Sequence, residues 1–472
     1  MQRRGSSSSA AACPISGGLR EKAATGATAR PRAAFSLGLL LIALPLLAHC
    51  GLTPARRATP LPPPAPPTSA TAAARDAVLP LSPDAELQAL IDPYPAPSGP
   101  SWLGGDVASS IRLADDRYVW IFGDTLLGVL HGDCAVRGGA CRREIAGPGA
   151  GMIANSVGTM VRSRDGSFYP IVKYWRSEGD ASAPIFATSE EGFLWPLAGV
   201  RVGTVLLIAA NRHTFESGLL PVGNHLIRVY NPDAPPDIWL YDVQPLPGFV
   251  APAPDGGPLV SWTTALVHVG RHVYLFGSRD VGEKAETVVA RVAVDDLAER
   301  GWRPAPEFLV RAADGGAPLW STDLPAASAL HVVPGLPGTS EAAIAHDAAL
   351  GWYTFQIPAL SYDIRLYTAD DLLGPWTDRG VVYAIPAPWS TTTRGPCPPL
   401  PPGTTLEEIP PACEHVYAAY APKTHPELAP PDGYVVTYNV NVWSGGYDAA
   451  VRALEEQPAF YVPQMLATPD AR

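Results

Sequence analysis

The stretch 118–123, Tyr-Val-Trp-Ile-Phe-Gly, returns at 272–277 as His-Val-Tyr-Leu-Phe-Gly. Looser copies begin at Gly351 (Gly-Trp-Tyr-Thr-Phe) and at Gly433 (Gly-Tyr-Val-Val-Thr-Tyr). Each copy joins a turn to a strand that carries an aromatic residue near its end. Spacings of about 70–150 residues between such copies are typical of propeller blades built from four strands each. The repeat therefore predicts a β-propeller, and the alternative is a two-sheet sandwich with unusually large insertions.

Around these copies, short runs rich in Val, Ile, Leu and aromatic residues alternate with Gly, Pro, Asp or Asn turns, a spacing that predicts an all-β fold. The chain has 53 Pro and 44 Gly but only 17% charged residues, which agrees with many turns and short elements. Beyond the repeat itself, strands are expected at 157–161, 205–209, 238–243, 265–269, 288–294 and 364–368. Dividing roughly 370 residues among five blades gives roughly 74 for each, which suits a loop-rich five-bladed propeller.

The N-terminal region has the composition of an export signal. Residues 34–48, AFSLGLLLIALPLLA, are uncharged and apolar and follow Arg30 and Arg32; such a run is too short for a bilayer span but normal for a signal peptide. The run leads to Leu47-Ala48-His49-Cys50, similar to a lipobox, in which Cys50 would carry the lipid. Because His49 departs from that pattern, an ordinary secretory signal is the alternative. We expect an outer-membrane or cell-surface lipoprotein, or otherwise a periplasmic or secreted protein.

A Pro-, Ala- and Thr-rich segment follows the signal, including LPPPAPPTSATAAA, and this composition is typical of an extended spacer. The predicted organisation is an export signal in 1–50, a linker in 51–100 and one propeller domain in 101–472.

The cysteines agree with export. Cys134 and Cys141 form one close pair, and Cys397 and Cys413 form another. In an oxidising compartment the simplest expectation is two local disulfides. A zinc site is the competing interpretation, but neither pair has CxxC spacing or a nearby run of histidines, so we favour disulfides.

The charge distribution argues against nucleic acid as a partner. The chain has a net charge of −11, yet residues 1–57 hold eight basic and one acidic side chain, or +7. The remaining residues therefore carry −18. Phosphate backbones would repel so acidic a domain.

The densest group of residues suited to chemistry is Trp102–Ser110, followed by Trp120–Thr125. Asp106 and Asp124 each follow a glycine at one end of a predicted strand. The two strands of one hairpin would bring both carboxyls to the same mouth of the funnel. Cleavage of a glycosidic bond needs two such groups, one protonated and one ionised. The alternative is a pair of turn aspartates, because Gly-Asp is common in hairpins.

The chain also resembles a known family. The similarity rests on the stretch GGDVASSIRLADDRYVWIFGDTLLG, on 154–157, on APKTHPEL at 421–428 and on VTYNVN at 436–441. These motifs are similar to a bacterial family catalogued as a domain of unknown function. The resemblance implies a five-bladed β-propeller related to arabinanases, xylosidases and levansucrases, and some members of the family are endo-D-arabinanases.

The resemblance also implies roles for particular residues. Asp106 and Asp124 match the acidic positions that form the catalytic pair in the arabinanase members. In related propellers a glutamate from a middle blade is the general acid, and Glu341 is the candidate by position; a solvated loop glutamate is the alternative. The loop at 131–150 and the insert at 390–413 depart from the family and leave the substrate open.

Several further residues are candidates for substrate binding, each with a structural alternative. Asn155 would bond a sugar hydroxyl or cap a turn. His425 and Glu427, two residues apart around Pro426, would face the same side of an extended segment. There His425 would either contact substrate or hold the last blade to the first. Further candidates are Asn439 and the tryptophans Trp195, Trp262, Trp320 and Trp389, which would stack on sugars or fill the packing between blades.

The sequence thus predicts a glycosidase acting on a furanoside-containing, arabinan-like extracellular or cell-wall glycan. The alternative is a non-catalytic surface lectin or adhesion propeller, since a fold does not settle function. The expected partners are a polysaccharide or oligosaccharide, with membrane contact only through the lipid anchor. No cofactor and no metal site are predicted, and a structural calcium on the propeller axis stays open.

Overall fold

The computed structural model of the chain describes residues 59–60, 79–131, 142–217, 220–251, 258–281, 284–295, 297–299, 301–358, 361–386, 417–430, 433–442 and 460–469. They belong to one compact unit, Arg56–Arg472. The predicted export signal with Cys50, the four paired cysteines and Trp389 lie outside the described residues. Among the described residues, no helix is both long enough and apolar enough to cross a membrane.

The described part of the chain consists mainly of β-strands. They form antiparallel sheets, and most neighbouring strands in a sheet also follow one another in the sequence. The first two sheets are β4 (Ser109–Ala114), β5 (Arg117–Phe122), β9 (Ser156–Val161) and β10 (Val172–Tyr174), then β13 (Phe193–Val202), β14 (Val205–His213), β15 (Gly223–Val229) and β16 (Tyr241–Pro245). The third contains β17 (Leu259–Val269), β18 (His272–Val281), β19 (Lys284–Ala293), β20 (Glu307–Val310), β21 (Leu319–Ser321) and β1 (Thr59–Pro60), with β22 (Val332–Pro337) on β19.

The fourth sheet is β23 (Ile344–Asp347), β24 (Gly351–Gln356), β25 (Asp363–Ala369) and β26 (Thr377–Ala384). The last combines β27 (Tyr417–Thr424), β28 (Val435–Val442) and β29 (Gln464–Ala467) with the N-terminal β2 (Ser82–Pro83). A smaller sheet holds β3 (Ser101–Gly105), β6 (Thr125–His131), β7 (Arg142–Glu144) and β8 (Gly151–Ile153), and β11 (Arg176–Glu178) pairs with β12 (Ala181–Ala183). The helical turns are α1 (Ala85–Ile91), η2 (Pro236–Ile238) and η3 (Ala327–Ala329).

The four copies of the sequence repeat occupy equivalent places in this fold. They form β5, β18, β24 and β28, and each of these is the second strand of its sheet. The strands expected at 157–161, 205–209, 265–269, 288–294 and 364–368 are also present. At 238–243 the strand begins later, at Tyr241, because Pro236–Ile238 forms a 3₁₀ turn.

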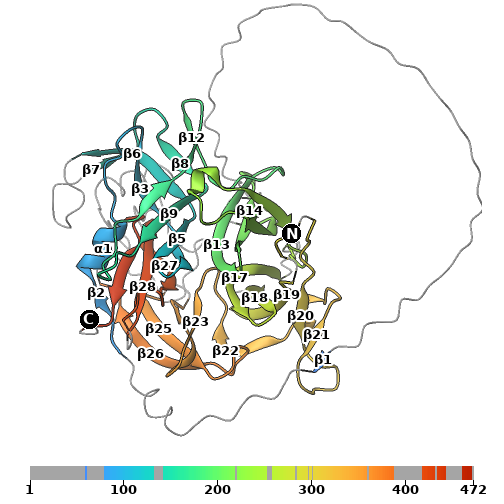
Figure 1. Cartoon of the computed structure of the whole chain (residues 1–472). Helices are drawn as coiled ribbons and strands as arrows, with labels where there is room; N and C mark the ends of the chain where they lie inside the picture. The colour runs from blue at the N-terminus through green and yellow to red at the C-terminus, as the bar shows by residue number, and fades with distance from the viewer. Residues whose placement is uncertain are drawn as a thin grey trace, which may run out of the picture. The chain divides into compact units, whose positions relative to one another are not determined.

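An apolar core fills each interface between consecutive sheets. The cores contain Ile121 with Ile208 (first and second sheets), Leu207 with Leu275 (second and third), Phe276 with Tyr367 (third and fourth), Phe355 with Val436 (fourth and last) and Trp120 with Met465 (last and first). Full burial of one such side chain stabilises the fold by about 1.5–3 kcal/mol. Because the last core joins the last sheet to the first, the sheets close on themselves in a propeller-like arrangement. In Figure 1 the successive sheets are coloured from cyan through green, yellow and orange to red, and β13, β17, β23 and β27 lie nearest the middle.

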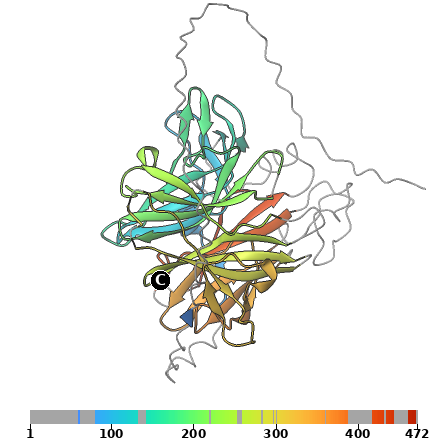
Figure 2. The same cartoon turned by 90° about the vertical axis from the view of Figure 1, so that its right-hand side faces the viewer.

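The N-terminal segment closes the last sheet. β2 pairs with β29 through Ser82 opposite Ala467 and Pro83 opposite Leu466. The helix α1 follows at once, and Asp84 caps it by accepting a hydrogen bond from the Leu87 amide (2.9 Å), an arrangement that stabilises a helix start. The folded part therefore begins before the predicted boundary at residue 101, because 82–91 pack against the last sheet. In Figure 2 the red strands of this sheet again lie between the cyan and the orange strands.

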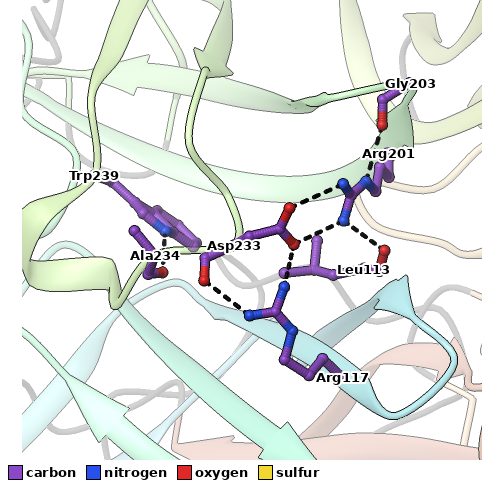
Figure 3. A network of polar contacts seen from close by, with 7 residues as sticks. All are labelled: Leu113, Arg117, Arg201, Gly203, Asp233, Ala234 and Trp239. Carbon is purple, nitrogen blue, oxygen red and sulfur yellow. Dashed lines mark hydrogen bonds and ion pairs between the residues drawn. The ribbon is translucent and has the colours of Figure 1, made fainter.

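An ion-pair network joins the first and second sheets at the surface (Figure 3). Asp233 accepts hydrogen bonds from Arg201 (3.0 and 3.1 Å) and pairs with Arg117. Arg201 also donates to the carbonyls of Leu113 and Gly203. The hydrogen bond from Arg201 lowers the pKa of Asp233, and both arginine charges act in the same direction.

Replacing Asp233 by Asn tests the contribution of this network. The side chain of Asp233 is 51% exposed, so we expect a loss of only about 0.5–1 kcal/mol in the free energy of unfolding at pH 7. Because its pKa is lowered in the folded state, the stabilisation is present above about pH 4 and disappears as the pH falls through the lowered pKa. Urea unfolding at pH 7 and pH 3 measures both effects. Asp237→Asn, an exposed position in the same loop, is the control, and equal losses in both variants would contradict the prediction.

Candidate active site

Asp106 and Asp124 lie together at one end of the β4–β5 hairpin. Asp106 precedes β4 and Asp124 follows β5, and the Asp106 amide donates a hydrogen bond to the Asp124 carbonyl (3.2 Å). Both residues are partly exposed. The two residues thus lie at the same end of one hairpin, as expected from the sequence.

The backbone around the two aspartates is strained. In the described residues, positive φ angles outside glycine occur at Val107 (65°), Ala108 (47°), Ala421 (52°) and Tyr461 (60°). Such conformations cost of order 1–3 kcal/mol each and cluster at functional sites. All four lie beside this pair. Val107 and Ala108 directly follow Asp106, and Ala421 follows Tyr420, which donates a hydrogen bond to Asp106. Tyr461 itself donates a hydrogen bond to Asp124. The fold therefore holds local strain where the carboxyls are positioned.

Gly123 permits a close approach of the Asp106 carboxyl to the end of β5. A Cβ atom at this position would lie 2.4 Å from Asp106 Oδ1 and 2.9 Å from Val107 Cγ2. Any other residue at position 123 would therefore displace the Asp106 carboxyl from this position.

Asp106 is held by a tyrosine from the last sheet. The Tyr420 hydroxyl, on β27, donates a hydrogen bond to Asp106 Oδ2 (2.9 Å). Burial raises the pKa of Asp106 well above its usual range, and the charges of Asp124 and Glu341 raise it further, against the lowering effect of Tyr420. Asp106 therefore favours the protonated form.

Asp124 is held by two donors from other sheets. Trp195 Nε1, on β13, donates to Asp124 Oδ1 (2.6 Å), and the Tyr461 hydroxyl donates to Oδ2 (3.5 Å). Burial raises the pKa of Asp124 to about 7, although both hydrogen bonds act to lower it. Near neutral pH this carboxyl therefore exchanges readily between its protonated and ionised forms.

Glu341 completes a group of three carboxyls. It lies between β22 and β23, its side chain is 13% exposed, and its charge raises the pKa of both aspartates. Its Oε2 atom is buried with no hydrogen-bond partner among the described residues. Burial raises the pKa of Glu341, while the charge of Lys423 lowers it.

Lys423, which the sequence analysis did not single out, supplies the positive charge of the site. Its Nζ donates to the carbonyls of Leu197 (3.0 Å) and Ala342 (3.1 Å) and lies 3.9 Å from Glu341 Oε2. The side chain is fully buried, and burial lowers its pKa to about 8. A lysine within the otherwise apolar run 416–423 was the available signal.

Acid and base roles can be divided among these carboxyls, because their surroundings differ. Asp124 has two donors to stabilise its ionised form and Asp106 has one, while Glu341 has only a nearby ammonium. A pair of carboxyls with unlike protonation is what glycoside cleavage requires. Among the described residues no group of three or more His, Cys, Asp or Glu side chains is arranged to hold a metal ion.

The structure places His425 and Glu427 in packing between sheets. His425 is fully buried, with Nδ1 2.6 Å from Ser110 Oγ and Nε2 2.8 Å from Thr437 Oγ1. Its ring stacks on Trp120 of the first sheet (4.8 Å between centroids), and burial lowers its pKa to about 3. Glu427 accepts a hydrogen bond from the same Ser110 hydroxyl. Both ring nitrogens of His425 thus have hydrogen-bond partners within the protein. Of the two roles expected for His425, this arrangement fits the structural one, in which it joins the last sheet to the first.

Asn155 is also structural in this fold. It is fully buried, donates to the carbonyls of Phe186 (3.0 Å) and Leu194 (2.9 Å), and accepts from the Phe186 amide (2.9 Å). These bonds satisfy the amide, so the expectation that it binds a sugar hydroxyl is corrected. Asn439 is likewise buried and donates to the Gly105 carbonyl (3.3 Å), which positions the backbone just before Asp106.

The predicted stacking tryptophans separate into two groups. Trp195 is partly exposed and touches Asp124. Trp320 is buried on β21, far out in its sheet, under the Arg291 guanidinium (4.2 Å from the ring centroid). Trp262 is buried and donates to the Gly248 carbonyl (2.7 Å). Of these three tryptophans, Trp195 alone is placed to contact a substrate bound at the carboxyls.

Comparison with known protein families shows which family the chain belongs to. A family model described as "Domain of unknown function (DUF5005)" matches residues 97–462. The chain belongs to this family. The match includes strands of every sheet and all three carboxyls, and no curated protein matches the chain.

Solved structures show relatives of the fold. A Bacteroides ovatus ATCC 8483 protein for which a hydrolase function has been suggested is 15% identical, with a TM-score of 0.57 over 83% of this chain and 90% of its own. The α-L-arabinofuranosidase of Podospora anserina, in complex with cellotriose, is 10% identical, with a TM-score of 0.35 over 83% and 96%. The α-L-arabinanase of Cellvibrio cellulosa is 11% identical, with a TM-score of 0.33 over 72% and 88%. The first of these shows a shared fold, and the other two are too distant to carry an argument.

Replacing Asp124 by Asn should stabilise the protein at alkaline pH. A carboxyl whose pKa is raised by folding gives its full stability below the unfolded value, near pH 4, and loses it as the pH rises through the folded value of about 7. We expect the variant to exceed the wild type by at least about 1 kcal/mol at pH 8, with the difference shrinking toward pH 4. Urea unfolding at pH 4, 6 and 8 measures it. Asp115→Asn, at the other end of the hairpin, is the control, and a variant less stable than wild type at pH 8 would refute the assignment.

Replacing Trp195 by Phe should raise the pKa of Asp124. The indole N–H stabilises the ionised carboxyl, and hydrogen bonds to charged groups contribute roughly 1.5–3 kcal/mol, so its loss should move the titration upward by about one pH unit. Carbon-13 NMR of labelled aspartate carboxyls measures this. Trp352→Phe is the control, since that ring packs on His346 instead. A titration that stays in place would show that the hydrogen bond does not act on Asp124.

Proposed function

We propose that this protein is a glycoside hydrolase acting on a furanoside-containing, arabinan-like glycan outside the cytoplasm. The observation that carries the proposal is the convergence of Asp106 and Asp124, at one end of the β4–β5 hairpin, with Glu341, from between β22 and β23. All three remain partly exposed, and burial raises the pKa of each. Buried carboxyls with raised pKa values in one site are typical of acid and base catalysts.

The roles follow from the surroundings of each carboxyl. Asp124, with hydrogen bonds from Trp195 and Tyr461, is the group that reacts in its ionised form, as nucleophile or as base toward water. Asp106, whose pKa lies well above its usual range, or Glu341 protonates the leaving oxygen. Tyr420 and Tyr461 orient the two aspartates, and Lys423 is a positioning residue that acts through Glu341.

The finer architectural predictions belong to the same proposal. We assign the sheets begun by β4, β13, β17, β23 and β27 to the blades of a five-bladed propeller, and the carboxyl cluster to its central funnel. Export, a lipid on Cys50 and the disulfides Cys134–Cys141 and Cys397–Cys413 remain predictions from the sequence. An anchored enzyme would meet polymers too large to enter the cell, such as cell-wall arabinan.

Hydrolysis assays on the full-length protein test the proposal. Wild type incubated with soluble arabinan, xylan and levan should release oligosaccharides from arabinan, and Asp106→Asn and Asp124→Asn should each lower the rate at least about 100-fold, because acid–base catalysis contributes on that scale. Asp115→Asn should keep wild-type activity, since that exposed side chain lies in the turn at the far end of the hairpin.

The outcomes separate the two functions that the sequence left open. No product from any of the three glycans, combined with glycan binding that survives in both Asn variants, would replace hydrolysis by a lectin function. Product release that persists in both Asn variants would remove the carboxyl mechanism.

A further inference from the structure

A row of aromatic side chains leads from Asp124 to the surface. Trp195, which donates to Asp124, lies 5.6 Å from Phe193 between ring centroids, and Phe193 lies 5.5 Å from Phe215. Exposure increases outward: Trp195 and Phe193 are partly exposed, and Phe215 is 93% exposed. The row therefore connects solvent with one of the three carboxyls.

The β13–β14 hairpin holds these rings in place. Phe193 pairs with His213 across the two strands, and the buried His213 ring packs against both Phe193 (5.8 Å) and Trp195 (4.0 Å). The turn that carries Phe215 is fixed by Thr214 and Ser217, whose amides each donate to the other's hydroxyl (3.0 and 3.1 Å, respectively). Phe215 thus projects from an ordered turn.

So exposed a phenylalanine contributes nothing to a core. Single exposed apolar residues are normal on protein surfaces, but this ring continues a line of contacts that ends at a carboxyl. Aromatic rings offer a flat apolar face that suits a sugar ring, whose C–H groups gather on one side. Neighbouring centroids are 5.5–5.6 Å apart, comparable to the length of one sugar residue, and neighbouring rings are tilted by 57° and 52°. Successive sugar residues on the row would therefore turn relative to one another.

Charged side chains lie on the other face of the same hairpin, because Arg212 pairs in register with Leu194 and alternates with His213 along β14. Glu190, 45% exposed, pairs with Arg212 (3.1 Å) and with His225 (3.0 Å). Hydrogen bonding from His225 lowers the pKa of Glu190 and keeps it ionised. Arg212 also donates to the Glu191 carbonyl (2.8 Å). These contacts tie the segment before β13 to β14 and β15 and so help to hold the hairpin that carries the row.

We propose that Trp195, Phe193 and Phe215 form an extended platform for the glycan chain, on which successive sugar residues stack from the cleavage point at Asp124 outward. The inference rests on the proposed function and deepens it. The occupant is a polysaccharide segment, because the row reaches beyond one sugar residue. The protein should therefore favour polymeric substrates over a single glycoside.

The test compares a long and a short substrate in Phe215→Ala, using the full-length protein. The ratio of kcat/KM on soluble arabinan to that on p-nitrophenyl arabinofuranoside should fall about tenfold, mainly through a higher KM for the polymer. Phe215→Trp should restore the ratio, because it keeps an aromatic face. Leu324→Ala removes another exposed apolar side chain (56% exposed) and should leave the ratio unchanged.

Affinity electrophoresis in gels with arabinan, xylan or levan separates failure of the platform from failure of hydrolysis. Wild-type retardation that Phe215→Ala weakens, without any hydrolysis, would sustain the platform and overturn the enzyme. Hydrolysis and retardation that Phe215→Ala leaves unchanged would overturn the platform alone. Neither hydrolysis nor retardation with any of the three glycans would overturn both.

Discussion

One buried ammonium group links the parts of this structure on which the site depends. Lys423 Nζ, on the last sheet, donates to carbonyls of Leu197 on β13 and Ala342 before β23, and it faces Glu341. A buried charge is costly unless it is hydrogen-bonded and paired, so these segments must stay within reach of the lysine. The same contacts that satisfy the lysine bring Trp195, Glu341 and Tyr420, which lie on or next to these strands, toward the two aspartates. The contacts of Lys423 therefore both hold the sheets together and bring the three carboxyl side chains into one site.

The site is maintained at a cost in stability. Burial of three carboxyls opposes their ionisation, and positive φ angles at Val107, Ala108, Ala421 and Tyr461 add backbone strain. The apolar cores between consecutive sheets offset these terms, since they bury large side chains around the whole circuit. Backbone strain is thus confined to the site, while close packing lies between the sheets. A pre-organised site in a rigid scaffold requires this arrangement.

The residues predicted for the site divide according to burial. His425, Glu427 and Asn155 have hydrogen bonds to protein atoms that join one sheet to another. Asp106, Asp124, Glu341 and Trp195 keep part of their surface exposed. Residues of both kinds lie in similar Gly-, Pro- and aromatic-rich surroundings along the chain, and only their exposure separates the packing residues from those proposed to act in catalysis. The aromatic row from Trp195 to Phe215 extends the exposed set to the surface of the β13–β14 hairpin.

The sequence by itself determined the strands and their period. Alternation of apolar runs with Gly and Pro turns is a local property, so the repeated strand at 118–123, 272–277, 351–355 and 433–438 could be located, and with it the hairpin that pairs Asp106 with Asp124. What lies between sheets required the tertiary structure. Tyr420 and Tyr461 reach the aspartates across more than 300 residues of sequence, and Lys423 reaches Leu197 across 226. No local pattern records such a distance. The same holds for α1 and β2, whose place in the last sheet is decided by an edge strand at the other end of the chain. Local periodicity is written in neighbouring residues, whereas burial and hydrogen-bond partners arise only when the sheets close on one another.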